Sequence, residues 1–156
     1  MTSETDRREA AESLALALVG AGMQRMASRA LAAFLFSDKE SLTAGDLAEE
    51  LGVSAGSVSG AIKTVAQMGL IERMFVAGSR REHFRMRENA WTTLYTQQHV
   101  VIDNVLAAVD KGVDVVEPGR AYDRLTYMRD FYRYLLSELP VLVERFEQQR
   151  RGGSRP

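Results

Sequence analysis

The sequence contains no cysteine, which excludes disulfide bonds and thiolate metal sites. It has only two histidines, His83 and His99, and they lie too far apart for a local metal-binding motif. The glycine- and serine-rich run 52–60 lacks the Lys-Ser/Thr ending of a phosphate-binding loop. Because no arrangement typical of a nucleophile, a metal or a phosphate loop is present, an enzyme is the weakest hypothesis. We predict no catalytic residues, no metal and no cofactor.

Long hydrophobic runs are also missing. The apolar run 14–23 follows Arg7 and Arg8 and superficially resembles a secretory signal, but the residues before it are rich in carboxylates. No run approaches the roughly 20 apolar residues that a membrane-spanning helix needs. Together with the absence of cysteine, which fits a reducing compartment, this pattern predicts a cytoplasmic protein without membrane contact.

The sequence also has no excess of charge of one sign. The 156 residues are 46% hydrophobic and 26% charged, with a formal net charge of −1, which is typical of a globular chain. Net charge therefore does not predict a nucleic-acid partner, and any basic surface must be local. The segment 63–87 has such a local excess, with two carboxylates, Glu72 and Glu82, against six cations. These cations are Lys63, Arg73, Arg80, Arg81, Arg85 and Arg87.

The stretch 41–87 contains signals for two short helices joined by a tight turn. Thr43 and Asp46 have the spacing of a capping box, in which a hydroxyl and a carboxylate satisfy free N–H groups at a helix start. Gly52 follows the last turn, where a positive φ is favoured, and Ser54 suits the N-cap of the next helix. A glycine-containing connection of three or four residues between helices predicts a helix-turn-helix.

The second helix of this pair, 55–68, has two different faces. Its apolar side is formed by Val58, Ala61, Ile62 and Val65. The opposite side carries only small, hydroxylated, amide or cationic residues: Gly56, Ser57, Ser59, Gly60, Lys63, Thr64 and Gln67. A merely solvated helix face would favour Glu, Lys and Ala. Close approach to a ligand such as duplex DNA explains this composition better than exposure to water does.

A β-hairpin is expected after this helix. The alternating segments 70–76 and 83–87 predict two strands joined by a turn at 77–79, with Arg80 and Arg81 at or just after the tip. A guanidinium there is well placed for a narrow minor groove. The alternative is a solvated hairpin whose arginines protect a strand edge from aggregation. The preceding helix pair favours the DNA-binding interpretation.

The remainder of the chain is predicted to be helical. The fold class is therefore mainly α with a small β-hairpin wing, a winged helix-turn-helix flanked by N- and C-terminal dimerisation helices. Expected helices cover 4–20, 23–36, 90–109 and 119–150, with a break at 111–118 and an interruption or bend near Pro140. The expected divisions are N-terminal helices for dimerisation or support at 1–40, a DNA-binding lobe at 41–88, dimerisation helices at 89–150 and a disordered tail at 151–156.

The chain resembles the MarR family of bacterial winged-helix regulators, and within it the branch typified by regulators of glycine-betaine synthesis. The resemblance covers nearly the whole chain. The motifs that carry it are 47–54 (LAEELGVS), 57–59 (SVS), 69–73 (GLIER) and 78–81 (GSRR). The common family pattern has an Asp two residues before the wing-tip Arg, whereas Gly78 and Ser79 precede Arg80 here. Whether Arg80 or Arg81 enters the groove is therefore left open.

The resemblance implies a homodimer that binds duplex DNA through helix 55–68 and the wing, with repression relieved by a small-molecule effector. A dimer would place two recognition helices roughly 34 Å apart and require a near-palindromic operator. We expect Ser57, Ser59, Lys63 and Thr64 in the major groove and Arg80 and Arg81 in the minor groove. Arg73, Arg85 and Arg87 are expected near phosphates. The candidate DNA-binding residues are Ser54, Ser57, Ser59, Lys63, Thr64, Arg73, Ser79, Arg80, Arg81 and Arg85. The alternative function is a winged-helix adaptor that binds proteins and not DNA.

Aromatic residues of the long helices suggest an effector pocket. The candidates are Trp91, Tyr95, Tyr122 and Phe131, with Tyr127 and Tyr134 nearby in sequence. The resemblance to betaine-synthesis regulators implies a quaternary amine such as choline, held by cation–π contacts. An aromatic or lipophilic compound is the other option. For each residue taken singly, a place in the core or the dimer interface is the favoured alternative.

Overall fold

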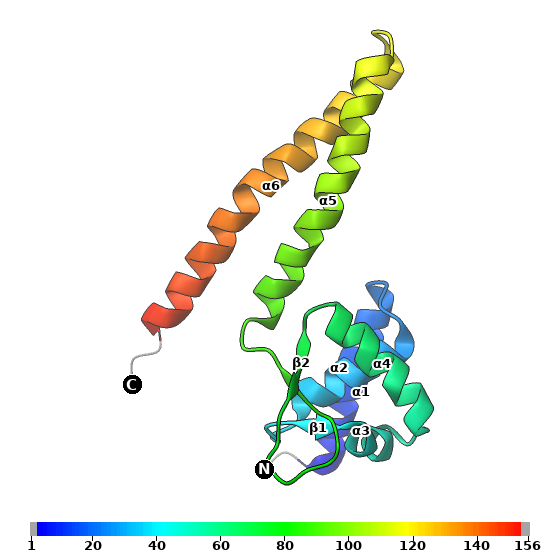
Figure 1. The fold of residues 1–156 in the computed structure, drawn as a ribbon, viewed down its shortest axis with the longest axis vertical. Helices are drawn as coiled ribbons and strands as arrows, with labels where there is room; N and C mark the ends of the chain where they lie inside the picture. The colour runs from blue at the N-terminus through cyan, green and yellow to red at the C-terminus, as the bar shows by residue number, and fades with distance from the viewer. Residues whose placement is uncertain (1–2, 154–156) are drawn as a thin grey trace. The chain divides into compact units, whose positions relative to one another are not determined.

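The computed structural model describes residues 3–153 as two compact units that divide between Leu94 and Tyr95 (Figure 1). It is mainly helical with one small antiparallel sheet, and the predicted winged-helix fold class is confirmed. The elements are α1 (Glu4–Gly20), α2 (Arg25–Phe36), β1 (Leu42–Thr43), α3 (Ala44–Leu51), α4 (Ala55–Gln67), β2 (Ile71–Met74), β3 (His83–Met86), α5 (Ala90–Val115) and α6 (Arg120–Gly153).

The first unit is organised around α2. This helix packs against α1, α3 and α4, and the middle of its sequence is almost entirely buried. Leu31 and Phe34 of α2 meet Val58 and Val65 of α4 in the hydrophobic core, together with Phe84 of the sheet. Because the other buried positions of α2 carry four alanines and Ser28, its neighbours can approach closely on several sides. The core therefore fixes α4 with its opposite face outward.

The predicted helix-turn-helix is confirmed in its local details. The Thr43 hydroxyl accepts a hydrogen bond from the backbone N–H of Asp46 at 3.1 Å, and the Asp46 carboxylate accepts one from the N–H of Thr43 at 2.8 Å. Gly52 ends α3 in the left-handed conformation, with φ 64° and ψ 36°. Ser54 then caps α4, since its hydroxyl accepts from the N–H of Ser57. Both helices begin and end where side-chain chemistry directs them.

The sheet has three strands in the order β1-β3-β2, all antiparallel. Both hairpin strands were predicted, although they are shorter than expected, and their register pairs Glu72 with Arg85 and Arg73 with Phe84. β1 was not predicted, because a two-residue strand carries no periodic signal. It lies on β3 through the pair Leu42–Phe84, and so attaches the start of the helix pair to the wing.

The second unit consists of most of α5, a short turn and α6. The expected break at 111–118 was wrong over most of its length, because α5 continues to Val115. Gly112 is the physical reason: a Cβ at this position would lie 3.3 Å from Cδ1 of Leu125, so the glycine permits close contact with α6 and does not end the helix. Asp110 and Arg133 join the same two helices in an ion pair at 2.8 Å.

Two further expectations about α6 need correction. Pro140 does not interrupt the helix, which runs from Arg120 to Gly153. A proline in a helix interior loses one backbone hydrogen bond, but the apolar stripe on both sides of it continues with helical spacing. The tail expected to be disordered at 151–156 is helical over 151–153, and its last three residues lie outside the described part of the chain.

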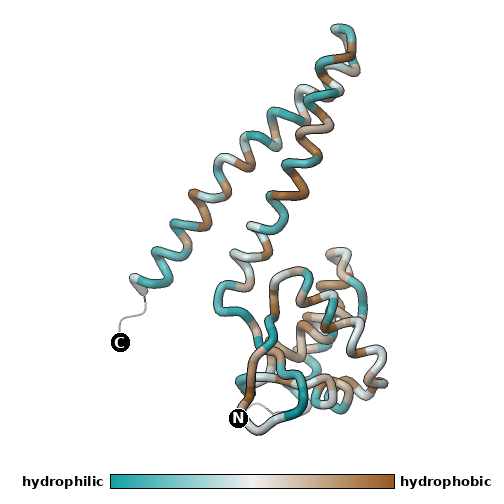
Figure 2. Tube along the Cα trace, viewed as in Figure 1, coloured by the Kyte–Doolittle hydropathy of each residue, from teal (hydrophilic) through white to brown (hydrophobic). Residues whose placement is uncertain are grey.

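Apolar side chains remain exposed along both helices of the second unit, where Figure 2 shows hydrophobic positions interspersed over the length of α5 and α6. The most exposed of them are Val100, Val101, Val115, Tyr127, Phe131, Tyr134, Val141 and Leu142. Within this unit only Leu106 and Val109 are buried hydrophobic residues among those that the structure describes. Over residues 3–153, no helix is both long enough and apolar enough to cross a lipid bilayer.

Candidate nucleic-acid interface

The two faces of α4 are arranged as the sequence predicts. Val58, Ala61, Ile62 and Val65 are buried, and they hold the helix on the core of the first unit. The opposite face points away from that core. Its members Gly56, Ser57, Ser59, Gly60, Lys63 and Gln67 are exposed, and Thr64 is half-buried. A continuous, small and polar helical surface is therefore presented by the first unit.

Packing within the chain does not require the two glycines of this face. A Cβ built on Gly60 would meet no atom within 4 Å, and one built on Gly56 would only reach the Ser54 hydroxyl at 4.0 Å. Neither glycine has a positive φ. Glycine costs about 1 kcal/mol relative to alanine inside a helix. The protein thus accepts a stability penalty on an exposed surface, which indicates that the missing side chains matter for something that approaches from outside.

The hydroxyl groups on α4 are partly engaged by the helix itself. Ser59 donates to the carbonyl oxygen of Ala55 at 3.1 Å, and Thr64 donates to that of Gly60 at 3.1 Å. These hydroxyls keep their oxygen lone pairs available, so they can accept hydrogen bonds from base amino groups. Ser57 differs, because it shares a hydrogen bond with the Ser54 hydroxyl near the helix start.

The wing turn places two predicted arginines differently. Gly78 has a φ of 79°, and the N–H of Ser79 donates to the carbonyl of Val76, which closes the turn. Arg80 is exposed at the tip. Arg81 is also exposed, but its Nη1 lies beside the start of α3, where a Cβ added to Gly45 would be 3.8 Å away. The Arg81 guanidinium therefore lies near the start of α3, whereas Arg80 is exposed at the turn.

Ion pairs divide the six cations of this region into two groups. Arg73 pairs with Glu82 at 2.9 Å, while Arg85 and Arg87 both pair with Glu72, at 3.0 Å and 3.7 Å. Within residues 3–153, the other three cations form no ion pair: Lys63, Arg80 and Arg81. The sequence reasoning missed this division. The cross-strand register would have revealed the Glu72–Arg85 pair, since directly opposed residues of unlike charge attract.

A hollow of about 510 Å³ separates α4 from the wing. Ser59, Lys63 and Gln67 line it on the helix side, and Arg73, Glu82 and Phe84 line it on the sheet side. Ser59 and Lys63, predicted for the major groove, and Arg73, predicted to lie near phosphate, thus border one concave surface. Three of the ten sequence-predicted DNA-binding residues, Ser59, Lys63 and Arg73, share this hollow, and the other seven lie outside its lining.

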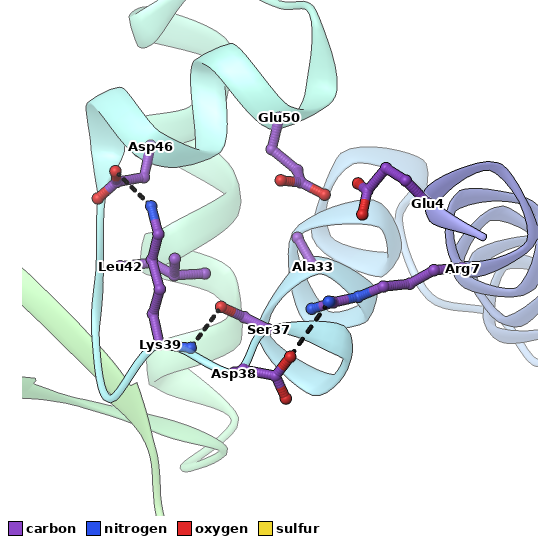
Figure 3. A pocket seen from close by; sticks show the side chains of 9 residues that line it. All are labelled: Glu4, Arg7, Ala33, Ser37, Asp38, Lys39, Leu42, Asp46 and Glu50. Atoms are coloured by element: carbon purple, nitrogen blue, oxygen red, sulfur yellow. Dashed lines mark hydrogen bonds and ion pairs between the residues drawn. The ribbon is translucent and has the colours of Figure 1, made fainter. Parts of the chain in front are cut away.

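A second hollow of about 370 Å³ lies among α1, α2 and α3 and is lined mainly by charged residues (Figure 3). Arg7 pairs with Asp38 at 3.2 Å and also donates to the carbonyl of Phe36, which ties α1 to the end of α2. Lys39 pairs with Asp46 at 3.1 Å. These contacts link the N-terminal helix to the start of the helix pair, and we interpret them as structural.

The Thr43 backbone N–H, and next the Thr43 hydroxyl, lower the pKa of the Asp46 carboxyl to about 2 by hydrogen bonding to its charged form. The nearby Lys39 contributes in the same direction and burial opposes it. The carboxylate that completes the capping box is therefore ionised at any pH at which the protein is expected to work.

The aromatic residues predicted for an effector pocket are not gathered by one copy of the chain. Tyr95 lies near the start of α5, roughly 30 Å along the helix from its end at Val115, whereas Tyr122 lies just beyond the turn on α6. Trp91, Tyr95, Tyr122 and Phe131 have exposed fractions of 46%, 50%, 37% and 52%. Phe131 packs edge-to-face on Tyr132, with ring centroids 5.3 Å apart. A pocket containing all four residues would need additional surface.

One residue with a clear geometric role, His83, was not predicted. His83 of β3 bonds through both ring nitrogens, to the hydroxyls of Ser41 and Ser79. Ser79 was expected to contact DNA, but its bond to the imidazole was not foreseen. A lone histidine between a wing turn and a strand gives no sequence signal, because its partners lie 42 and 4 residues away.

Comparison with known proteins adds to this geometry. Residues 21–82 match the profile of the MarR family, and residues 89–149 match that of an MmpR5-like MarR family transcriptional regulator. The HTH-type transcriptional regulator MmpR5 of Mycobacterium tuberculosis is 29% identical over 151 residues, which are 96% of this chain and 92% of that protein. A crystal structure of a transcriptional regulator superposes with a TM-score of 0.81 at 29% identity, covering 92% of this chain and 99% of the other.

The chain therefore belongs to the MarR family of transcriptional regulators. This family is a class of regulators and not of enzymes. The more specific resemblance to regulators of glycine-betaine synthesis is not confirmed, since the match over the long helices is to the MmpR5-like group.

Proposed function

We propose that this protein is a homodimeric repressor that binds a near-palindromic duplex through α4 and the wing, and that a small molecule releases it. The carrying observation is the exposed face of α4, whose glycines have open space around them at a cost in helix stability. Such a face allows the helix backbone to approach the floor and walls of the major groove. Lys63, Arg80 and Arg81, whose charges are not neutralised by ion pairs within residues 3–153, then supply the attraction to phosphate.

Gly60→Ala tests this proposal because stability and DNA binding should change in opposite directions. We expect the melting temperature to rise, since alanine favours the helix by up to about 1 kcal/mol, while affinity for the operator falls because the methyl group obstructs the groove. Gly20→Ala at the end of α1 is the matched control, as its Cβ would also meet nothing within 4 Å. Melting curves and fluorescence anisotropy with operator DNA give both readouts. Unchanged affinity in Gly60→Ala would contradict close approach by α4.

Arg80→Ala tests the wing. We expect a loss of operator affinity on the order of tenfold or more with the fold intact, because an exposed guanidinium at the tip is lost. Lys63→Ala should reduce the slope of log affinity against log salt by about one contact. Arg120→Ala, which removes an exposed cation at the start of α6, should change neither. If wild-type protein shows no salt-dependent binding to promoter or random DNA, the adaptor function replaces this proposal.

Dimerisation is supported by the second unit and by the family. Several contiguous apolar side chains on α5 and α6 are at least half exposed, including Val100, Val101, Val141 and Leu142. Surfaces of this kind on a soluble protein mark sites of association. A second copy of the chain is the occupant that the family suggests. On this proposal the N- and C-terminal helices dimerise and residues 41–88 bind DNA, in a cytoplasmic regulator.

The exposed aromatic residues of α5 and α6 suit either a quaternary amine, as the betaine branch would require, or an aromatic or lipophilic compound. Because one protomer does not gather them, the partner copy would have to complete the pocket. A thermal-shift screen with choline, betaine aldehyde and phenolic acids distinguishes the two classes, and the absence of a shift with every quaternary amine would remove the cation–π hypothesis.

A further inference from the structure

His83 occupies a junction of the wing. It is the first residue of β3, and its backbone is paired with Thr43 of β1 on one side and Met74 of β2 on the other. Its half-buried imidazole bonds to the Ser41 hydroxyl through Nδ1 at 3.0 Å and to the Ser79 hydroxyl through Nε2 at 2.8 Å. One side chain thus connects the residue that precedes β1 with the turn at the wing tip.

Ser79 is the point at which this connection reaches the tip. Its hydroxyl oxygen also accepts a hydrogen bond from the backbone N–H of Arg81 at 3.2 Å, and its own N–H donates to Val76 at 3.1 Å. Arg80 lies between the two backbone groups that Ser79 organises. The conformation of the peptide that carries the Arg80 side chain therefore depends on where the Ser79 hydroxyl is held.

A neutral His83 ring has only one N–H, so it can donate only one of its two hydrogen bonds to Ser41 and Ser79. A neutral imidazole donates from one nitrogen and accepts at the other. If Nε2 carries the proton, Ser41 donates to Nδ1 and Ser79 accepts from both Nε2 and Arg81. The hydroxyl proton of Ser79 is then free to donate outward. If Nδ1 carries the proton, Ser79 must donate to Nε2, and that proton is no longer available to a phosphate.

We propose that His83 is a positioning residue for DNA binding, which holds the wing turn against Ser41 and directs the Ser79 hydroxyl proton toward the DNA backbone. This inference rests on the proposed function. In it the Nε2-protonated imidazole fixes the turn from which Arg80 projects, and Ser79 becomes a phosphate donor as well as a turn residue. His83 itself makes no contact with DNA.

A pair of substitutions separates the two ring nitrogens. The amide of His83→Gln lies near the position of Nε2 and can still bond to Ser79, whereas the amide of His83→Asn lies near Nδ1 and reaches only Ser41. We expect His83→Asn to weaken operator binding on the order of tenfold, because one hydrogen bond that orders the turn is lost. His83→Gln should stay within about threefold of wild type on the same scale. Melting curves check that both variants fold.

Hydrogen exchange of backbone N–H groups tests the role of His83 in the free protein, without operator DNA. The backbone N–H of Arg81 should exchange with solvent faster in His83→Asn and in Ser79→Ala than in wild type, and at the wild-type rate in His83→Gln. Equal affinities of the two His83 variants together with unchanged Arg81 exchange would overturn the positioning role. If the wild-type protein binds no DNA, the proposed function fails, and amide exchange alone decides whether His83 orders the wing.

Discussion

The two units of this protein satisfy their apolar side chains in different ways. In the first, Leu31, Leu47, Val58 and Val65 are completely buried by the chain's own helices and sheet. In the second, two helices 26 and 34 residues long leave most of their apolar side chains in solvent. When two helices pack together, each can bury only one side of its surface against the other. The first unit therefore has a hydrophobic core of its own, whereas α5 and α6 of the second unit do not fully cover each other's apolar side chains.

The largest expected effect is a loss of folding stability, and it should differ between a buried apolar residue of the first unit and an exposed one of the second. Leu47→Ala, which empties a site that is 0% exposed, should lower the free energy of unfolding by about 3 kcal/mol. Val101→Ala, at 63% exposed, should cost little in a monomer. If a second copy covers Val101, the loss of stability caused by Val101→Ala must grow with protein concentration, because more of the protein is then dimeric. Chemical denaturation at two concentrations measures both, and a large, concentration-independent loss in Val101→Ala would contradict the contrast.

A charge on the exposed apolar stripe should have the next largest effect. Leu142 of α6 is 53% exposed, so an aspartate there is tolerated by a single chain but must be desolvated in an interface. We expect Leu142→Asp to weaken self-association by about 2 kcal/mol or more and to shift the particle toward 17.4 kDa in analytical ultracentrifugation. The control is Gln149→Asp on the same helix, at an exposed polar position. An unchanged dimer in Leu142→Asp would place the interface elsewhere.

The smallest effect concerns a polar contact of the first unit. The folded pKa of Asp46 is lowered from 3.8 to about 2, so its stabilisation is fully present above about pH 4 and is lost as the pH falls toward 2. Allowing for its partial exposure, we expect roughly 1 kcal/mol, which Asp46→Asn should remove. The free energy of unfolding between pH 4.5 and 2.5 measures this. Asp123→Asn in the first turn of α6 is the control, and parallel pH profiles for Asp46→Asn and wild type would contradict the prediction.

Much of the first unit was predictable because its signals are local. The capping box at Thr43, the left-handed Gly52 and the N-cap Ser54 each act within four residues, and the structure confirms all three. The two faces of α4 follow from helical periodicity alone. The same local reasoning failed over 111–118, where a break was expected, because Gly112 lies close to Leu125, a residue on another helix.

The sequence predicted which residues form the candidate site. It did not predict which of their charges are neutralised by ion pairs within the chain. The sequence did not show which of the six cations in 63–87 form ion pairs, and strand register pairs Arg73, Arg85 and Arg87 with two glutamates. The bond between His83 and Ser41 spans 42 residues and follows from the addition of β1 to the sheet. No local pattern encodes a contact that exists only after three strands have assembled.

By itself, the sequence determined most of the helical segments, where α3 and α4 begin, and which face of α4 carries the small polar residues. These properties depend on hydrogen bonds and periodicities within a few residues. Only the tertiary structure decided which cations form ion pairs, where the Arg81 guanidinium lies, and how an imidazole connects the wing turn to the residue before β1. Those outcomes depend on strand register and packing, because they join side chains that are distant in the chain and adjacent in space.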